Sequence, residues 1–234
     1  MAIDQTLLER AEHLGESWLR LYQWMPHCLS FGRHEPAARR YDRARIAELG
    51  LDTVRRPTGG RAVWHAQELT YALAAPSLRF GSLKAAYLEI HAMLADALRW
   101  LGAPAFLAPA IRTPPLDAGA CFAQPAGGEI MVGGRKVVGS AQLRQGGAFL
   151  QHGSVLLQDN QQVVLDVVRG AHDVQMPEAS DRSFGISEVV GAVTRSAQER
   201  WPGAWERFSN QELVLSGASS HYPRYRSLAW TWVR

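Results

Sequence analysis

The segment VRRPTGGRAVWHAQELTY, residues 54–71, combines three arginines with two glycines and a histidine. Glycine lets a ligand approach the backbone closely because it carries no Cβ atom. Arginine presents fixed N–H donors that suit phosphate or carboxylate groups. We therefore predict a loop that holds an anionic or thioester-carrying ligand. On residue types alone, the alternative is a plain turn between two strands with solvated arginines.

Two cysteines, Cys28 and Cys121, are too few for a disulfide framework. Cys121 lies in the glycine-containing segment DAGACFAQPAGGE, where a substrate could reach it. It is therefore the candidate nucleophile, since a reactive thiol must be accessible. Cys28 begins the apolar segment CLSF, which favours burial as a small hydrophobic residue.

Lysine is scarce in this chain: of the 25 lysines and arginines, only Lys84 and Lys136 are lysines. A lysine can lose its proton near neutral pH when it is desolvated or lies beside another cation, here Arg135. Lys136 is therefore a candidate general base. An exposed lysine in a hairpin is the alternative.

Two histidines lie near the arginine-glycine loop and the lysine segment. His65 follows the arginine-glycine segment, and His152 lies in the apolar segment LQHGSVLL, where a hydrogen-bonded core histidine is the alternative to a functional one. The eight histidines show no HxxxH or HxH spacing, and the cysteines are far apart, so we predict no metal site. A dinucleotide fingerprint and a phosphate-binding P-loop are also absent.

Hydrophobic periodicity predicts the elements that position these residues. Helices are expected over residues 3–14, 40–50, 82–102 and 186–201. Strands are expected over residues 18–24, 28–33, 51–56, 68–75, 129–134, 135–144, 148–158 and 162–168. The paired glycines at 133 and 134 indicate a hairpin, and the proline-rich segment 103–118 indicates an irregular connector. The order predicts an α+β fold with a largely antiparallel central sheet flanked by helices.

Composition limits the class of protein. The chain has 234 residues, 47% hydrophobic and 20% charged, as expected of one large globular domain. Its net charge of +3 is far from that of the basic tracts of nucleic-acid-binding proteins. Apolar runs are too short to cross a bilayer, and the opening residues read as an amphipathic helix, not a signal peptide. We therefore expect a single cytoplasmic domain over residues 1–234 that binds neither nucleic acid nor membrane.

Taken in order, these segments resemble the catalytic domain shared by lipoate–protein ligases, octanoyltransferases and biotin ligases. VRRPTGG is similar to the family's Arg-Arg-x-Ser/Thr-Gly-Gly loop. GGRKVVGSAQLRQGGAFLQHGSVLL, residues 133–157, is similar to its Gly-Arg-Lys-x-x-Gly-Ser-Ala-Gln segment followed by Gln-His-Gly-Ser. MAIDQTLL resembles the opening helix and LRLYQWMPHCLSFGR the strand pair after it. The resemblance is strong over residues 1–160 and weak beyond.

Within this family, three features resemble the cysteine-type octanoyltransferases. The loop continues as GGRAV followed by ELTY, ACF precedes the lysine segment, and no accessory C-terminal ligase domain is expected. The resemblance implies transfer of octanoyl from acyl carrier protein to a lysine of a lipoyl domain of a 2-oxo acid dehydrogenase, or of glycine-cleavage H protein. It implies no cofactor, and we expect a monomer.

The same resemblance implies roles for individual residues. Cys121 would be the nucleophile and Lys136 the residue that activates it. Backbone N–H groups around Gly139 and Ser140 would stabilise the oxyanion. The implied substrate-binding residues are Arg55, Arg56, Thr58, Gly59, Gly60, Arg61, His65, Gly139, Ser140, Ala141, His152 and Gly153.

Two other functions stay open at this point. An ATP-dependent lipoate–protein ligase would bind lipoyl-adenylate with the same loop, and Cys121 would then be incidental. A non-catalytic module, or an amidotransferase subunit, would only dock lipoyl domains, but intact Cys121 and Lys136 argue against it. The chain also departs from the family in HEP at 34–36, where glutamine is common, and in CFAQPAGGE, which lacks the usual aromatic before the glutamate. The family usually has about one more strand ahead of the first helix, which leaves open a true start upstream of Met1.

Overall fold

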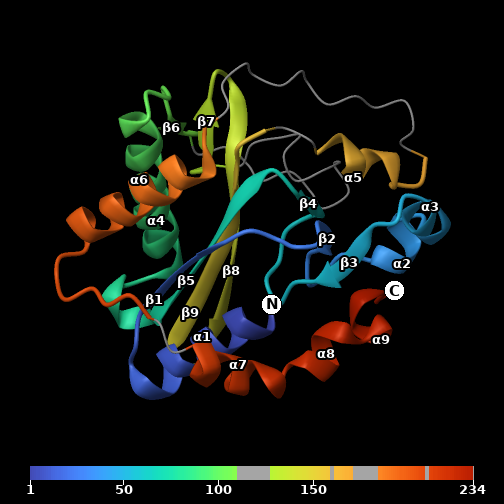
Figure 1. Cartoon of the computed structure of the whole chain (residues 1–234), viewed down its shortest axis with the longest axis horizontal. Coiled ribbons are helices and arrows are strands. Elements are labelled where there is room, and N and C mark those ends of the chain that lie inside the picture. The colour runs from blue at the N-terminus through green and yellow to red at the C-terminus, as the bar shows by residue number, and fades with distance from the viewer. Residues whose placement is uncertain (110–126, 159–160, 171–183, 209–210, 234) are drawn as a thin grey trace.

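A computed structural model describes residues 1–109, 127–158, 161–170, 184–208 and 211–233 (Figure 1). The strands are β1 (Trp18–Tyr22), β2 (Cys28–Phe31), β3 (Asp52–Arg55), β4 (Val63–His65), β5 (Glu68–Pro76), β6 (Phe106–Leu107), β7 (Ile130–Val132), β8 (Arg135–Gln145) and β9 (Ala148–Leu156). The helices are α1 (Ala2–Leu14), α2 (Ala37–Arg40), α3 (Arg43–Glu48), α4 (Leu83–Trp100), α5 (Gln162–Asp166), α6 (Ile186–Arg200), α7 (Gln211–Ser219), α8 (Tyr222–Arg226) and α9 (Leu228–Thr231).

The strands form two sheets. The larger has the order β1-β5-β9-β8-β7-β6, and every neighbouring pair in it is antiparallel. The smaller has the order β3-β2-β4, in which β2 is parallel to β3 and antiparallel to β4. The predicted α+β class with a largely antiparallel central sheet is therefore confirmed.

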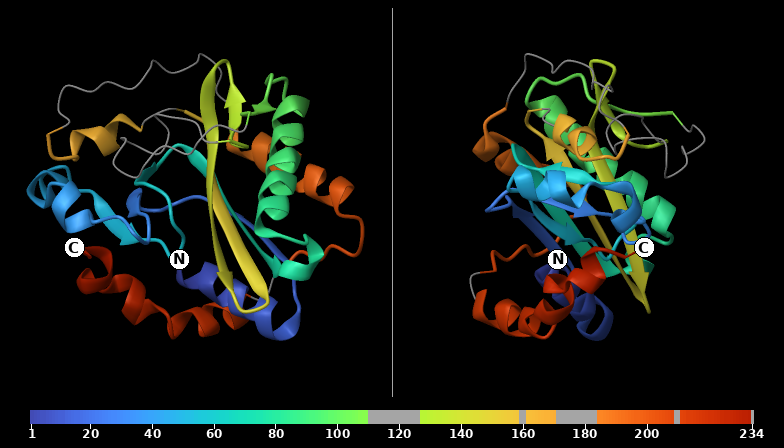
Figure 2. Two further views of the ribbon diagram at one scale, coloured as in Figure 1. Left: turned by 180° about the vertical axis from the view of Figure 1, so that it is seen from behind. Right: turned by 90° about the vertical axis from the view of Figure 1, so that its right-hand side faces the viewer.

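Alternate residues of β5 show how both faces of the large sheet are covered. Tyr71 and Leu73 belong to a hydrophobic cluster with residues of α4 and α6. Ala72 and Ala74 belong to a different cluster with Leu7 of α1. Because successive strand side chains point to opposite faces, the sheet is buried on both sides. Figures 1 and 2 show α4 and α6 together on one face, whereas α8 and α9 lie beside the small sheet.

Local signals explain the best-predicted elements. The Ser82 hydroxyl accepts a hydrogen bond from the Ala85 N–H and caps α4, and Gly102 follows the helix with a φ of +83°. Gly133 and Gly134 both have positive φ, as a tight two-residue hairpin between β7 and β8 requires. The helices predicted over 3–14, 82–102 and 186–201 are confirmed as α1, α4 and α6.

One predicted element is displaced and another is wrong. The helix predicted over 40–50 is the shorter α3 (Arg43–Glu48), because α2 ends at Arg40 and the Asp42 side chain accepts N–H bonds from Ala44 and Arg45 at the start of α3. Residues 162–168, predicted as a strand, instead contain the short helix α5. A side chain at the start of this helix, Gln161, binds it to β4. The Gln161 side chain, not a strand backbone, makes the hydrogen bonds to the Trp64 N–H and C=O there. The strand β4 and the helices α7–α9 had no clear periodic signal.

Candidate functional site

The arginine-glycine loop, residues 55–61, is a folded structure with buried arginines and an exposed glycine, Gly60. Arg56 is 5% exposed, and its guanidinium donates to the main-chain oxygens of Gly59 and Arg61 at 3.1 and 2.8 Å. These bonds close the loop around Gly60, whose φ of +90° favours glycine. Arg55 and Arg61 are buried as well. The alternative of a plain turn with solvated arginines is therefore wrong.

The loop lies against the centre of the large sheet. The Thr58 hydroxyl and His152 Nε2 are 2.6 Å apart. A Cβ atom built on Gly60 would lie 3.9 Å from the Ala141 Cβ atom. The structure thus brings together four residues that the sequence placed in one site, from two segments about 90 positions apart. On its other side, His152 Nδ1 lies 3.3 Å from the Asp4 carboxylate, and burial lowers the pKa of this histidine.

Glycines at the β8–β9 pair allow close approach of the two strands. Gly139 pairs with Ser154, and Ser140 pairs with Gly153. A Cβ atom on Gly153 would lie 2.4 Å from both the Gly139 carbonyl oxygen and the Ser140 hydroxyl oxygen, so only glycine fits. The pairing of β8 with β7 ends at Val138. Among the described strands, β8 therefore has a neighbour on one side only at Gly139 and Ser140.

A β-bulge determines the direction of Lys136. Ile130 pairs with Val138 while Met131 pairs with Lys136, so β8 carries one extra residue, Val137. Consistent with this, Val137 and Val138 both pack against the cluster of α4 and α6. Without the bulge, alternation would direct Lys136 toward α4 as well. With it, Lys136 lies on the opposite face, which it shares by alternation with Gly139 and Ala141.

Lys136 forms a buried ion pair. Its Nζ atom donates to Glu129 Oε1 at 2.6 Å, and the two side chains are 2% and 8% exposed. The alternative of an exposed hairpin lysine is therefore wrong. Such a pair withdraws both charges from water and is retained only with close geometry. The arrangement places an amine and a carboxylate in proton-transfer contact on the face that carries the arginine-glycine loop.

Arg55 contributes to the architecture of the site. Its side chain is fully buried and donates to the main-chain oxygens of Gly32, Arg33, Trp230 and Thr231 at 2.6–3.2 Å. The Trp230 indole in turn donates to the Arg55 carbonyl oxygen. Arg55 therefore ties α9 to the base of the loop, and the structure favours this role over the predicted contact with a ligand anion.

A second polar network lies behind Ser140, on the α4 face. The Ser140 hydroxyl is 2.7 Å from His91 Nε2 and 2.5 Å from the Tyr71 hydroxyl. His91 Nδ1 donates to the Gly128 carbonyl oxygen at 2.7 Å. His91 therefore holds two parts of the site in place. It contacts Ser140 in β8, and it binds the backbone at Gly128, next to Glu129, the ion-pair partner of Lys136. The Ser140 side chain itself points away from the loop, so only its backbone could serve the predicted oxyanion site.

We expect His91 to make stability depend on pH. Burial, with a smaller effect of Lys136, lowers its pKa from 6.5 to about 4. The unfolded chain therefore binds a proton below about pH 6.5 that the folded chain refuses until about pH 4. As the pH falls through this window, the free energy of unfolding should therefore decrease by about 3 kcal/mol.

Urea unfolding of wild type and His91→Gln at a series of pH values checks this. The difference in free energy of unfolding between wild type and His91→Gln should narrow as the pH falls through the window. The control His13→Gln, at an exposed position, should show the same pH dependence as wild type. A constant difference at every pH would contradict the expectation.

The structure describes one of the two cysteines. Cys28 is a buried free thiol in β2, as predicted. Cys121 lies outside the described residues, so its role stays a prediction. Among the described residues, no group of three or more histidine, cysteine or acidic side chains could hold a metal ion. No helix in that part of the chain is long and apolar enough to cross a membrane.

Comparison with known proteins agrees with this geometry. The model of the lipoyl protein ligase A/B catalytic domain matches residues 1–195. The chain belongs to this family. A protein named octanoyltransferase LipM from Moorella thermoacetica is 38% identical over 93% of the chain and 84% of its own length. Another of that name, from Carboxydothermus hydrogenoformans, is 41% identical over 92% and 76%.

Solved structures of lipoyl protein ligases share the fold. A putative lipoate protein ligase from T. acidophilum with bound lipoic acid has a TM-score of 0.81 at 20% identity, covering 99% of this chain and 92% of that one. A lipoate-protein ligase A bound with ATP has a TM-score of 0.79 at 20% identity and the same coverage. At this identity, the likeness establishes the lipoyl protein ligase fold alone.

Sequence reasoning missed several polar residues of the candidate site and its surroundings, namely Asp4, Ser30, Glu68, His91 and Glu129. Two of them left a readable signal. Glu129 stands just beyond the predicted Gly-Gly hairpin from Lys136, which places the two on neighbouring strands. His91 interrupts the apolar stripe of the helix predicted over 82–102. The others, Asp4, Ser30 and Glu68, are identified only once α1, β2 and β5 are placed in space.

Proposed function

We propose that this chain is an octanoyltransferase that moves an octanoyl group from acyl carrier protein, through a thioester at Cys121, to a lysine of a lipoyl domain. The observation that carries the proposal is the 33–41% identity to proteins named octanoyltransferase LipM over most of both chains. The geometry supports it, because the loop, Gly139 and Lys136 share one face of the sheet.

In the first half-reaction, the Cys121 thiolate attacks the carbonyl carbon of the octanoyl thioester. The bond to the donor sulfur breaks and an octanoyl-cysteine forms. Lys136 takes the proton of the Cys121 thiol and gives it to the departing donor thiolate. Since its ammonium is paired with Glu129, it first passes a proton to that carboxylate, 2.6 Å away. Exchange of one thioester for another is close to isoenergetic, so no ATP is required.

The tetrahedral intermediate carries a negative oxygen in each half-reaction. Backbone N–H groups around Gly139 and Ser140 are the proposed donors, since β8 extends past the end of β7 there and every second N–H along β8 points to that open edge. The arginine-glycine loop holds the acyl group or the pantetheine arm against this point. Gly59 and Gly60 allow the close backbone approach that such a ligand needs.

In the second half-reaction, the acceptor lysine attacks the octanoyl-cysteine. A C–N bond forms, the C–S bond breaks, and the thiol is restored. Lys136 takes a proton from the attacking nitrogen as the C–N bond forms and gives it to the departing thiolate. The amide product is more stable than the thioester, so this step drives the overall transfer forward.

We expect purified protein to transfer octanoyl from octanoyl-acyl carrier protein to a lipoyl domain without ATP or magnesium. Mass spectrometry of the acceptor measures the gain of one octanoyl group on its lysine. A gain that appears only with ATP and free octanoate would instead assign the chain to the ligases, whose fold it shares.

A further inference from the structure

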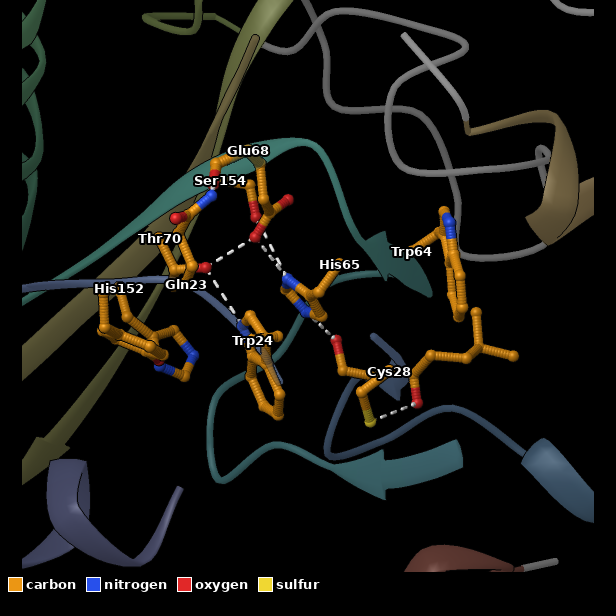
Figure 3. Close-up of polar contacts among 12 residues, drawn as sticks. Gln23, Trp24, Cys28, Trp64, His65, Glu68, Thr70, His152 and Ser154 are labelled. Atoms are coloured by element: carbon orange, nitrogen blue, oxygen red, sulfur yellow. Dashed lines mark hydrogen bonds and ion pairs between the residues drawn. The ribbon is translucent and has the colours of Figure 1, made fainter. Parts of the chain in front are cut away.

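A buried chain of hydrogen bonds extends beyond the loop into β4 and β5 (Figure 3). The Ser30 hydroxyl lies 2.6 Å from His65 Nε2, and His65 Nδ1 lies 2.6 Å from Glu68 Oε1. The Thr70 hydroxyl donates to the same Glu68 oxygen at 2.5 Å, and the Trp24 indole N–H donates to Thr70. All but Trp24 are buried. Of these residues, only His65 was predicted to contact substrate, and the proposed transfer gives the others no role.

The hydrogen bonds of this network all donate in the direction of Glu68. The Arg56 guanidinium donates to the Ser30 hydroxyl oxygen at 2.6 Å. The Ser30 proton is therefore directed to His65 Nε2, which leaves the other proton of a neutral imidazole on Nδ1, facing Glu68. Trp24 stacks on the His65 ring with centroids 4.6 Å apart and holds it in place. The chain thus delivers two donors to one oxygen of Glu68, Oε1.

The second oxygen of Glu68 has no such partner. Glu68 is 1% exposed, and its Oε2 atom is buried without a hydrogen bond. Figure 3 shows this oxygen pointing away from His65 and Thr70. A carboxylate oxygen that is held away from water without a hydrogen-bond donor is unfavourable. Buried polar atoms in folded proteins nearly always have a hydrogen-bond partner, so this oxygen is available to a donor from a ligand.

Glu68 lies on the face of the sheet that carries the proposed site. It alternates with Leu69, which packs toward α4, so its side chain points to the opposite face. Thr70, on the same face, pairs with Ser154, which pairs with Gly139. Glu68 is therefore two residues along β5 from the row that leads to Gly139, on the face shared with Lys136.

We propose that Glu68 Oε2 receives the ammonium group of the acceptor lysine. This inference rests on the proposed function, in which that lysine is the one cationic reactant. The ammonium transfers a proton to Glu68 and becomes the neutral amine that attacks the thioester. Glu68 later releases this proton to solvent. His65, Thr70 and Ser30 act as positioning residues, because they hold the other carboxylate oxygen.

The two half-reactions separate this proposal from the function on which it rests. Glu68→Gln keeps the shape of the side chain but removes its charge and basicity. Octanoyl-Cys121 should form at the wild-type rate, and its discharge to the lipoyl domain should slow by about 10²-fold or more. Discharge to hydroxylamine, a small nucleophile that is uncharged at neutral pH, should be unchanged. Glu199→Gln, on the exposed face of α6, is the matched control and should behave as wild type in all three assays.

Each other outcome has a definite meaning. Wild-type discharge to the lipoyl domain by Glu68→Gln, or an equal loss with hydroxylamine, overturns the proposal. If Glu68→Gln fails to fold, Glu68→Asp, which keeps the charge, should slow discharge to the lipoyl domain alone. Loss of octanoyl-Cys121 formation in both variants would assign Glu68 to the fold and also overturn the proposal. Absence of octanoyl-Cys121 in wild type would instead refute the proposed function.

Discussion

Replacing Cys121 with alanine is expected to abolish octanoyl transfer, whereas Cys28→Ala should leave it nearly intact. Cys28 is 6% exposed within β2, and burial, with a smaller effect of Asp52, raises its pKa to about 12. A thiol in this state is not a nucleophile near neutral pH, because the thiolate is the reactive form. Cys121 is then the cysteine left to carry the acyl group.

Intact-protein mass spectrometry after incubation with octanoyl-acyl carrier protein measures the octanoyl adduct, and a lipoyl-domain assay measures transfer. Wild type and Cys28→Ala should both gain one octanoyl group, and Cys121→Ala none. Cys28→Ala also serves as the control for loss of a thiol, since it should cost stability without changing the chemistry. An inactive, properly folded Cys28→Ala with an active Cys121→Ala would reverse the assignment.

Hydrophobic periodicity was sufficient for most of the fold. The helix α4 has a cap at Ser82, an apolar stripe and a glycine at its end, so three independent signals agreed. Residues 162–168 show the opposite case. Their apolar run VVLDVV suits a strand or a buried helix equally, and the deciding contact, Gln161 with Trp64, is non-local. Short apolar runs of this kind cannot be resolved without knowledge of their neighbours.

In the candidate site, too, local features were predicted and non-local ones were not. The family resemblance grouped Thr58 with His152, and the structure brings these two side chains into contact. Local motifs could not show that Arg55 binds main-chain oxygens of Trp230 and Thr231, about 175 positions away. Nor could they show the bulge beside Lys136, since the adjacent apolar residues Val137 and Val138 suit a regular strand buried on both faces equally well. That bulge decides which face of the sheet receives the amine.

Lys136→Arg is expected to lower transfer by about 10²- to 10⁴-fold, the usual loss when a general base is removed. Arginine keeps the positive charge and can still pair with Glu129. Its guanidinium, however, stays protonated at any working pH and cannot accept the thiol proton. Octanoyl-Cys121 should therefore form slowly even with saturating donor.

Charge and base roles are separated by the pH dependence of this first step. Raising the pH ionises the Cys121 thiol without assistance, so acyl-enzyme formation by Lys136→Arg should recover toward the wild-type rate at alkaline pH. A purely structural defect at this buried position would not recover in this way, and thermal melting shows whether the larger guanidinium is accommodated. Replacing Lys84, the other lysine, with arginine is the matched control and should leave transfer unchanged. Rapid accumulation of octanoyl-Cys121 in Lys136→Arg at neutral pH, followed by normal transfer, would mean that Lys136 only pairs with Glu129. The proton of the thiol would then have to leave by another group on the same face of the sheet.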